Sequence, residues 1–144
     1  MATPSSSPAT RHTATATLPL SMRPTTPSSA RAWIRATLHR WGLDDLVDTV
    51  ELLASELIGN AIRHTGRPRH LRLHHGEAPD GTTLTCEVTD GDPRPPRTTR
   101  ASSPDDESGR GMGLVALLTE RNGATPTRDG KAVWFQVLAA APSR

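Results

Sequence analysis

The stretch DDLVDTVELLASELIGNAIRHTG, residues 44–66, decides the fold. Its apolar residues recur every three or four positions, which is the spacing of an amphipathic helix. The apolar stripe consists of Leu46, Val50, Leu53, Leu57 and Ala61, broadened by Val47, Ala54, Ile58 and Ile62. Asp44 or Asp45 can cap the start, and Thr65-Gly66 is expected to end the helix. The stretch therefore predicts one long helix that must bury one face against a second layer.

The flanking sequence supplies that layer. Alternating apolar and polar residues predict strands, and turn residues separate them. The expected elements are an edge strand at 13–20, a helix at 28–41 stopped by Gly42, strands at 69–75 and 82–89 joined by a turn from Gly76 to Gly81, a short helix at about 112–121, and strands at 124–128 and 131–139 joined by Asp129-Gly130. This order favours an α/β (α+β) two-layer sandwich, in which helices cover one face of a mixed, mostly antiparallel sheet.

Length and composition fit one domain. The chain has 144 residues, a size that supports one hydrophobic core. Cys86 is the only cysteine, which excludes a disulfide scaffold and a cysteine-rich zinc module. There is no run of about 18 apolar residues and no secretory signal, so we expect a cytoplasmic protein without a membrane segment. Residues 1–12 are expected to form a disordered N-terminal tail, followed by a domain at 13–140.

The charge pattern argues against nucleic acid as a partner. Seventeen Lys and Arg residues are balanced by fifteen Asp and Glu residues, which gives a net charge of +2. The basic residues are spread along the chain, with no concentrated stripe and no aromatic stacking platform. An arginine-rich nucleic-acid interface at residues 63–72 stays open as an alternative, and it predicts strongly salt-dependent binding.

Three polar residues lie in one row of the long helix. Glu56, Asn60 and His64 are spaced four residues apart, so their side chains project from the same side. A carboxylate and a carboxamide beside an apolar stripe suit a hard cation such as Mg²⁺. Glu56 could also orient or deprotonate a hydroxyl group. A solvated helix face is the alternative interpretation of this spacing.

Two further motifs contain residues suited to nucleotide binding. Asp90 stands where a predicted strand runs into Gly91, and its carboxylate can accept a hydrogen bond from an exocyclic amine such as that of adenine. A turn-forming Asp-Gly is the alternative. The stretch GRGMG at 109–113 precedes an apolar helical run, and its alternate glycines let backbone N–H groups approach phosphate; a flexible hinge is the alternative. The loop at 91–108 between the two motifs is typical of a functional or mobile segment.

Together, the three motifs resemble the nucleotide-binding boxes of the GHKL ATPases, which have the Bergerat fold. The stretch ELIGNAIRH at 56–64 is similar to the N box, VTDG at 88–91 to the next box, and GRGMGL at 109–114 to the glycine-rich box. The closing GKAVWF at 130–135 resembles the last strand of the family. Within the superfamily, the chain resembles most the stand-alone anti-sigma regulatory factors, which are serine/threonine kinases with a histidine-kinase-like ATP-binding domain.

The resemblance implies a role for each matched residue. Asn60 would hold Mg²⁺, Glu56 would be the catalytic base or its orienter, and Asp90 would read the amino group of adenine. The other nucleotide-binding residues implied are His64, Gly91, Gly109, Arg110, Gly111, Met112, Gly113 and Leu114. Residues 91–108 would form the ATP lid. The implied cofactors are ATP and Mg²⁺, and the implied reaction is γ-phosphate transfer to a protein serine, which depends on positioning and charge neutralisation.

The resemblance also implies partners: an antagonist protein that is phosphorylated, a sigma factor that is sequestered, and a second copy of the chain in a homodimer. Two motifs depart from the family pattern. Asp92 and Arg94 stand where the nucleotide box usually has glycines, and Lys131 and Ala132 stand where the last strand often carries two threonines. A non-catalytic regulatory binding module with weak or no ATP binding is therefore the alternative function.

Two other features are interpreted as structural. His74 and His75 are neighbours on a predicted strand, so their side chains should point to opposite faces and cannot easily share a metal ion. Cys86 alternates with Leu84 and Val88 and is expected to be a small buried hydrophobic residue.

Overall fold

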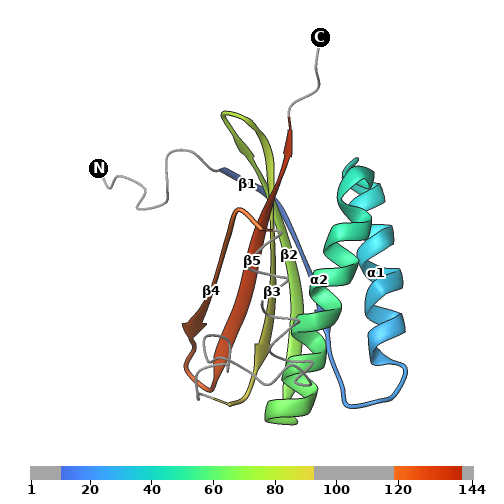
Figure 1. The fold of residues 1–144 in the computed structure, drawn as a ribbon, viewed down its shortest axis with the longest axis vertical. Coiled ribbons are helices and arrows are strands. Elements are labelled where there is room, and N and C mark those ends of the chain that lie inside the picture. Colours follow the sequence, from blue (N-terminus) through green and yellow to red (C-terminus); the bar gives the residue numbers. More distant parts are fainter. Residues whose placement is uncertain (1–10, 93–118, 141–144) are drawn as a thin grey trace, which may run out of the picture.

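The computed structural model describes residues 11–92 and 119–140. Figure 1 shows the arrangement of the strands and helices in this part of the chain. The elements are β1 (Arg11–Pro19), α1 (Thr26–Arg40), the 3₁₀ turn η1 (Asp44–Leu46), α2 (Val47–Asn60), the π-helical turn η2 (Ala61–Thr65), β2 (Pro68–Ala78), β3 (Gly81–Asp90), β4 (Arg121–Pro126) and β5 (Lys131–Ala140). Their order agrees with the predicted order, apart from the helix at about 112–121, most of which lies outside the described residues.

The strands form one five-stranded sheet in the order β1-β2-β3-β5-β4, and every neighbouring pair is antiparallel. Helices α1 and α2 lie side by side on one face of this sheet (Figure 1). The predicted two-layer α/β sandwich is confirmed, and the described sheet is antiparallel throughout rather than mixed. None of the helices in the described ranges is long and apolar enough to span a membrane.

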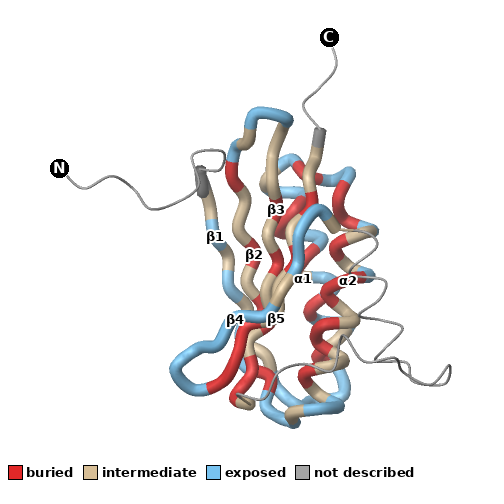
Figure 2. The backbone as a smooth tube through the Cα atoms, turned by 60° about the vertical axis from the view of Figure 1, so that its left-hand side comes forward, coloured by how far each residue is buried: buried red, intermediate tan, exposed pale blue. Residues whose placement is uncertain are grey.

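The core fills the space between the helices and the sheet (Figure 2). All five residues of the predicted apolar stripe are buried, as are Ile34 and Leu38 of α1. Alternate residues of β2 and β3 complete the core from the sheet side. Cys86, on the central strand β3, is fully buried as predicted, and burial raises the pKa of its thiol.

The turn between β2 and β3 is shorter than predicted. Glycine is a turn signal in a sequence, so the turn was expected to run from Gly76 to Gly81. In the structure Gly76 is a buried strand residue that pairs with Thr83 of β3, and only Pro79 and Asp80 separate the strands. Pairing on both sides of β2 extends this strand past the glycine.

The two edge strands begin earlier than predicted. β1 begins at Arg11, inside the predicted tail, and pairs along β2. β4 begins at Arg121, so the last residue of the predicted helix at about 112–121 lies in a strand, as do Asn122-Gly123. β4 ends at Pro126, which leaves a turn at 127–130 before β5. These strand ends are polar, so hydrophobic alternation does not mark them.

The chain widens after α2 into the π-helical turn. The Gly66 N–H donates to the Ala61 carbonyl oxygen over 3.0 Å, and the Thr65 hydroxyl donates to the same oxygen over 2.6 Å. Gly66 has φ +65°, in the left-handed region that favours glycine, which confirms the predicted end of the helix. π-Helical turns are rare and occur frequently at functional sites, and this one directly follows Asn60.

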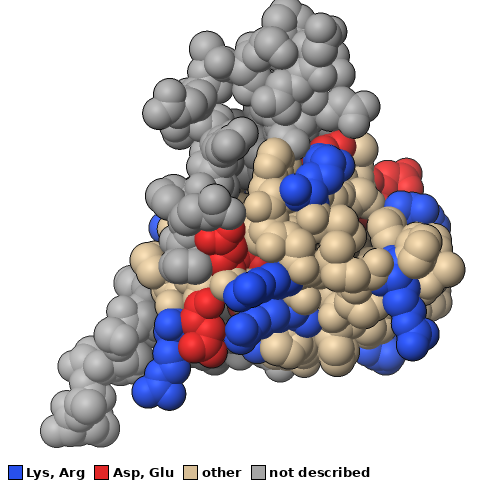
Figure 3. Space-filling view, turned by 90° about the horizontal axis from the view of Figure 1, so that it is seen from below, with Lys and Arg blue, Asp and Glu red and all other residues tan. Residues whose placement is uncertain are grey.

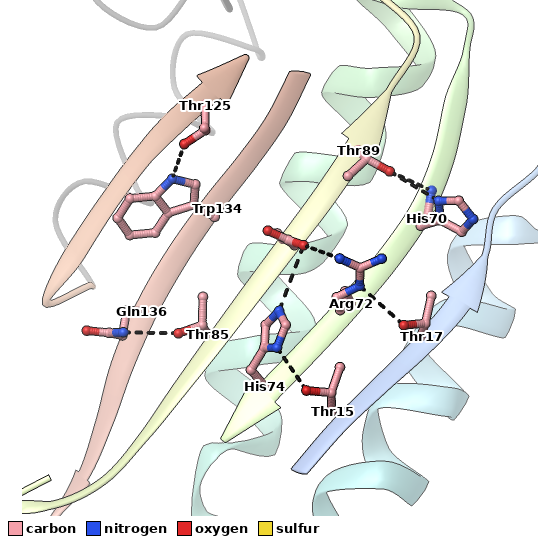
Figure 4. A network of polar contacts seen from close by, with 11 residues as sticks. Thr15, Thr17, His70, Arg72, His74, Thr85, Thr89, Thr125, Trp134 and Gln136 are labelled. Carbon is pink, nitrogen blue, oxygen red and sulfur yellow. Dashed lines mark hydrogen bonds and ion pairs between the residues drawn. The ribbon is translucent and has the colours of Figure 1, made fainter. Parts of the chain in front are cut away.

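The sheet face that turns away from the helices carries a polar network (Figure 4). Glu87 on β3 is its centre, with Oε1 at 3.1 Å from Arg72 Nη1 and 3.8 Å from His74 Nε2. Threonines of β1 extend the network, because Thr17 Oγ1 lies 3.3 Å from Arg72 Nε and Thr15 Oγ1 lies 3.0 Å from His74 Nδ1. The network therefore links the three strands β1, β2 and β3.

The two neighbouring histidines of β2 point to opposite faces, as predicted. His74 joins the polar network, whereas the His75 ring lies on the helix side with its centroid 4.5 Å from that of Trp41. Burial lowers the pKa of His75. No group of three His, Cys, Asp or Glu residues that could hold a metal ion occurs within 11–92 and 119–140.

Glu87→Gln is expected to lower the free energy of unfolding at neutral pH by about 1 kcal/mol, because charge-assisted contacts are lost. The contact with His74 is the largest cause that lowers the pKa of Glu87, and Arg72 adds to it against the opposing effect of burial. A carboxylate whose pKa is lowered in the folded state stabilises the fold above its unfolded pKa, and this stabilisation is lost as the pH falls through the folded pKa.

The difference between wild type and Glu87→Gln should therefore shrink as the pH falls below about 4.5. Urea unfolding at a series of acidic to neutral pH values measures this difference. Glu77→Gln, at an exposed carboxylate of β2, is the control. A difference that stays constant down to acidic pH would contradict the role assigned to Glu87.

Candidate functional site

Asp90 ends β3, and two groups of the chain hold its carboxylate. Lys131 Nζ lies 3.2 Å from each carboxylate oxygen, and the Asp92 N–H donates to Oδ1 over 2.8 Å. Lys131 Nζ also donates to the Asp92 carbonyl oxygen, 3.0 Å away. A bond from the N–H two residues later is an Asx turn. The turn-forming role left open for Asp90 is therefore present, together with an ion pair that the sequence interpretation did not include.

The register of β3 and β5 brings Lys131 to Asp90. The two residues are direct cross-strand partners, so their side chains project from the same face of the sheet. That face is covered by the helices, and only 3% of the Asp90 side chain and 8% of the Lys131 side chain are exposed. Gly130 has no room for a Cβ atom, which would overlap the Asp90 carbonyl oxygen. The two strand ends are therefore in close contact at this point.

Arginine side chains cover the residue after Asp90. The Gly91 N–H donates to the Arg67 carbonyl oxygen over 3.0 Å, and a Cβ on Gly91 would lie 3.3 Å from side-chain atoms of Arg67 and Arg69. Arg69 Nη1 lies 3.4 Å from Asp129 Oδ2 in the turn before β5. Figure 3 views the molecule from this end and shows basic and acidic side chains close together on it. Arg67, just before β2, and Arg69 of β2 thus lie against the residue that follows β3, and Asp129 of the β4–β5 turn pairs with Arg69.

Glu56 and Asn60 lie on α2, which contacts β3. Both residues are half-buried, one helical turn apart and on the same side of the helix. Asn60 Oδ1 is a buried atom with no hydrogen-bond partner in the described part of the chain. Buried polar atoms are nearly always hydrogen-bonded, and an unpaired one costs stability. Asn60 Oδ1 therefore marks a place where a ligand can complete the site.

The Asn60 amide oxygen fits a magnesium ligand. Mg²⁺ takes oxygen donors, accepts few of them from the protein and uses water and phosphate for the rest. Glu56 supplies a carboxylate one turn earlier. The Arg63 guanidinium group lies over Gly59, where a Cβ would come within 2.9 Å of it, and it places a positive charge beside the residue that precedes Asn60. These groups suit an anionic ligand that carries a divalent cation.

Among the predicted site residues that the structure describes, Glu56, Asn60 and Asp90 lie on two elements in contact, α2 and β3. Glu56 and Asn60 are on the helix that contacts the strand ending at Asp90-Gly91. His64, in the π-helical turn, is exposed. The predicted phosphate-binding residues lie outside the described residues, as does the predicted lid from residue 93 onward: these are Gly109, Arg110, Gly111, Met112, Gly113 and Leu114.

Sequence comparison agrees with this geometry. The chain matches the family model of histidine kinase-like ATPase domains over residues 20–137, which is most of its length. The chain therefore belongs to the histidine kinase-like ATPase family, and the predicted membership of the GHKL superfamily is confirmed. No curated protein matches the chain in sequence. The two-layer α/β structure is consistent with the Bergerat fold of that superfamily.

Sequence reasoning missed the contact between Lys131 and Asp90. The sequence shows that Lys131 is the only lysine of the chain, and that it replaces a threonine of the pattern that the chain resembles. Its partner is 41 positions away, so no local motif contains both. Aligning the predicted strands at 82–89 and 131–139 as an antiparallel pair, with Val88 opposite Val133, is the step that finds it.

Proposed function

We propose that this chain is an ATP-dependent regulator of the anti-sigma type. It acts as a serine/threonine kinase that phosphorylates a small antagonist protein, and it sequesters a sigma factor when that antagonist is absent. Membership of the histidine kinase-like ATPase family supports ATP binding. The resemblance of residues 56–64, 88–91 and 109–114 to the boxes of the anti-sigma kinases supports the finer assignment. A cytoplasmic location and a homodimer are part of this proposal.

The observation that carries the proposal is the buried Asn60 Oδ1 without a hydrogen-bond partner. In the proposed site Asn60 Oδ1 would hold Mg²⁺, and the metal ion would supply charge neutralisation for the phosphates of ATP. Glu56 accepts the proton of a serine hydroxyl on the antagonist as the hydroxyl oxygen attacks the γ-phosphorus. The bond between the γ-phosphorus and the bridging oxygen breaks, and ADP leaves with the electron pair.

A non-catalytic regulatory module with weak or no ATP binding is the second candidate. The ion pair between Lys131 and Asp90 favours it, because the carboxylate that would read adenine already has a buried partner. Such a module would bind its protein partners through the same fold without transferring phosphate. The two candidates differ in whether Mg-ATP binds and in whether phosphate reaches a serine.

Mg-ATP is expected to raise the thermal unfolding midpoint of the wild-type chain. Ligand at about 100 times its dissociation constant adds roughly 2.7 kcal/mol of stability. Asn60→Ala should remove most of this gain because it deletes the proposed magnesium ligand. Asn122→Ala, at the other asparagine of the chain and on the exposed strand β4, should leave the gain unchanged.

Scanning calorimetry with ATP and Mg²⁺ varied separately measures this stabilisation. A gain that needs both ligands and depends on Asn60 would support the nucleotide site. The absence of any gain in the wild type at millimolar Mg-ATP would favour the non-catalytic module. An equal gain in Asn60→Ala would show that Asn60 does not hold the metal.

A further inference from the structure

The Asp90 carboxylate, which would bind the amino group of adenine, already has partners within the chain. Two hydrogen bonds and one ion-pair contact reach the Asp90 carboxylate. The Asp92 N–H and the Lys131 ammonium donate to Oδ1 over 2.8 Å and 3.2 Å, and the ammonium lies 3.2 Å from Oδ2. A carboxylate has about four acceptor sites in all. Because only 3% of the Asp90 side chain is exposed, the remaining site is not open to solvent either.

The Lys131 ammonium is equally engaged. Its three N–H groups have three acceptors within 3.2 Å, namely the two oxygens of Asp90 and the carbonyl oxygen of Asp92. An ammonium group has three donors and no acceptor. Lys131 is therefore held by Asp90 and the Asp92 carbonyl oxygen, and moving it away from Asp90 would leave a buried charge without its counter-ion.

A second observation concerns the other side of Asp90. The side chains of Arg67 and Arg69 lie against Gly91, and Gly91 itself is buried. Glycines in such boxes let a ligand approach the backbone closely. At Gly91 the side chains of Arg67 and Arg69 fill the space that a ligand would need to approach the backbone.

From these contacts we infer that Lys131 sets the base selectivity of the site. This inference rests on the proposed function, because it concerns how the same site binds its nucleotide. A 6-amino group must share Asp90 with Lys131 or displace it. Displacement exchanges an ammonium partner for a neutral amine and leaves the ammonium without its counter-ion, so the amino group adds little to binding. The triphosphate and its metal ion then supply most of the affinity, and the site discriminates poorly between purines that differ at position 6.

The first test uses the wild-type chain and three triphosphates. They are ATP, inosine triphosphate with a 6-oxo group, and purine riboside triphosphate with hydrogen at position 6. The dissociation constants of their Mg²⁺ complexes, measured by calorimetry, are expected to agree within about threefold. A hydrogen bond to a free charged group would instead favour ATP by about tenfold or more, and a preference of that size in the wild type would overturn the inference.

The second test releases the carboxylate. Lys131→Thr, which introduces the residue of the family pattern, is expected to create a preference for ATP over inosine triphosphate of about tenfold. Arg128→Thr removes a cation from the exposed turn next to β5 and should leave the ratio unchanged. Circular dichroism at the binding temperature confirms that Lys131→Thr is folded, and the three-nucleotide comparison in the wild type does not depend on this variant.

The outcomes separate the inference from the proposed function. A strong wild-type preference for ATP overturns the inference and leaves the proposed function intact. If only Lys131→Thr binds ATP, Lys131 closes the site to nucleotides altogether, which overturns both the inferred weak base discrimination and the ATP-dependent function of the native chain. If neither protein binds any triphosphate while both are folded, both are overturned, because releasing Asp90 has not produced a base-reading site.

Discussion

Asp90→Ala is expected to lower the free energy of unfolding by about 3–5 kcal/mol, the usual effect of removing one partner from a buried ion pair. The variant leaves the Lys131 ammonium in place, with 8% of its side chain exposed and without its counter-ion. It also removes the acceptor of the Asp92 N–H. Denaturant unfolding at neutral pH gives the difference from the wild type.

Asp129→Ala is the matched control for this change. Asp129 is also paired with a cation, Arg69, but about half of each side chain is exposed, and exposed pairs contribute only about 0–1 kcal/mol. The double variant Asp90→Ala with Lys131→Met should recover much of the lost stability, because it removes both buried charges. A loss below about 1 kcal/mol in Asp90→Ala would contradict the buried position of Lys131.

Glu56→Gln is expected to slow phosphate transfer by about 10²–10⁴-fold, the usual contribution of a general base, while the affinity for Mg-ATP is largely kept. The amide has nearly the same shape as the carboxylate but cannot accept the serine proton. Single-turnover phosphorylation of the antagonist protein with radiolabelled ATP measures the rate, and calorimetry measures binding in parallel.

Glu51→Gln is the control on the same helix. Glu51 pairs with Arg35 of α1 at 3.0 Å, away from the proposed reaction, so its replacement should leave the rate unchanged. An undiminished rate in Glu56→Gln would show that another group accepts the proton. No phosphate transfer in either the wild type or the variant would favour the non-catalytic module.

The helices could be predicted from the sequence because their signals are local. The apolar stripe of α2 and the left-handed Gly66 both lie within one continuous stretch, and both are confirmed. Strand boundaries were predicted less well. Gly76 has the local signature of a turn, but hydrogen bonding to β1 and β3 keeps it in a strand. Pairing between segments distant in the sequence therefore sets the strand boundaries that local sequence signals predict wrongly.

In the candidate site, too, the residues on one helix could be predicted from the sequence, whereas a contact between two strands could not. Glu56 and Asn60 could be assigned from their spacing on one helix, and the structure adds the unpaired oxygen of Asn60. The state of Asp90 could not be assigned in this way, because it depends on the register between β3 and β5. A carboxylate that looks free in the sequence is an ion-paired group in the fold, and that difference changes which nucleotide chemistry the site can select.

Cys86 has a consequence for measuring how this sheet opens. It is the only thiol of the chain, it is fully buried on the central strand, and burial raises its pKa. A thiol reagent acts on the thiolate and needs access to it, so labelling under native conditions requires the sheet to separate from the helices. The labelling rate therefore reports the opening equilibrium of the core at one known position, and any ligand that binds only the closed form must slow that reaction in proportion to its occupancy.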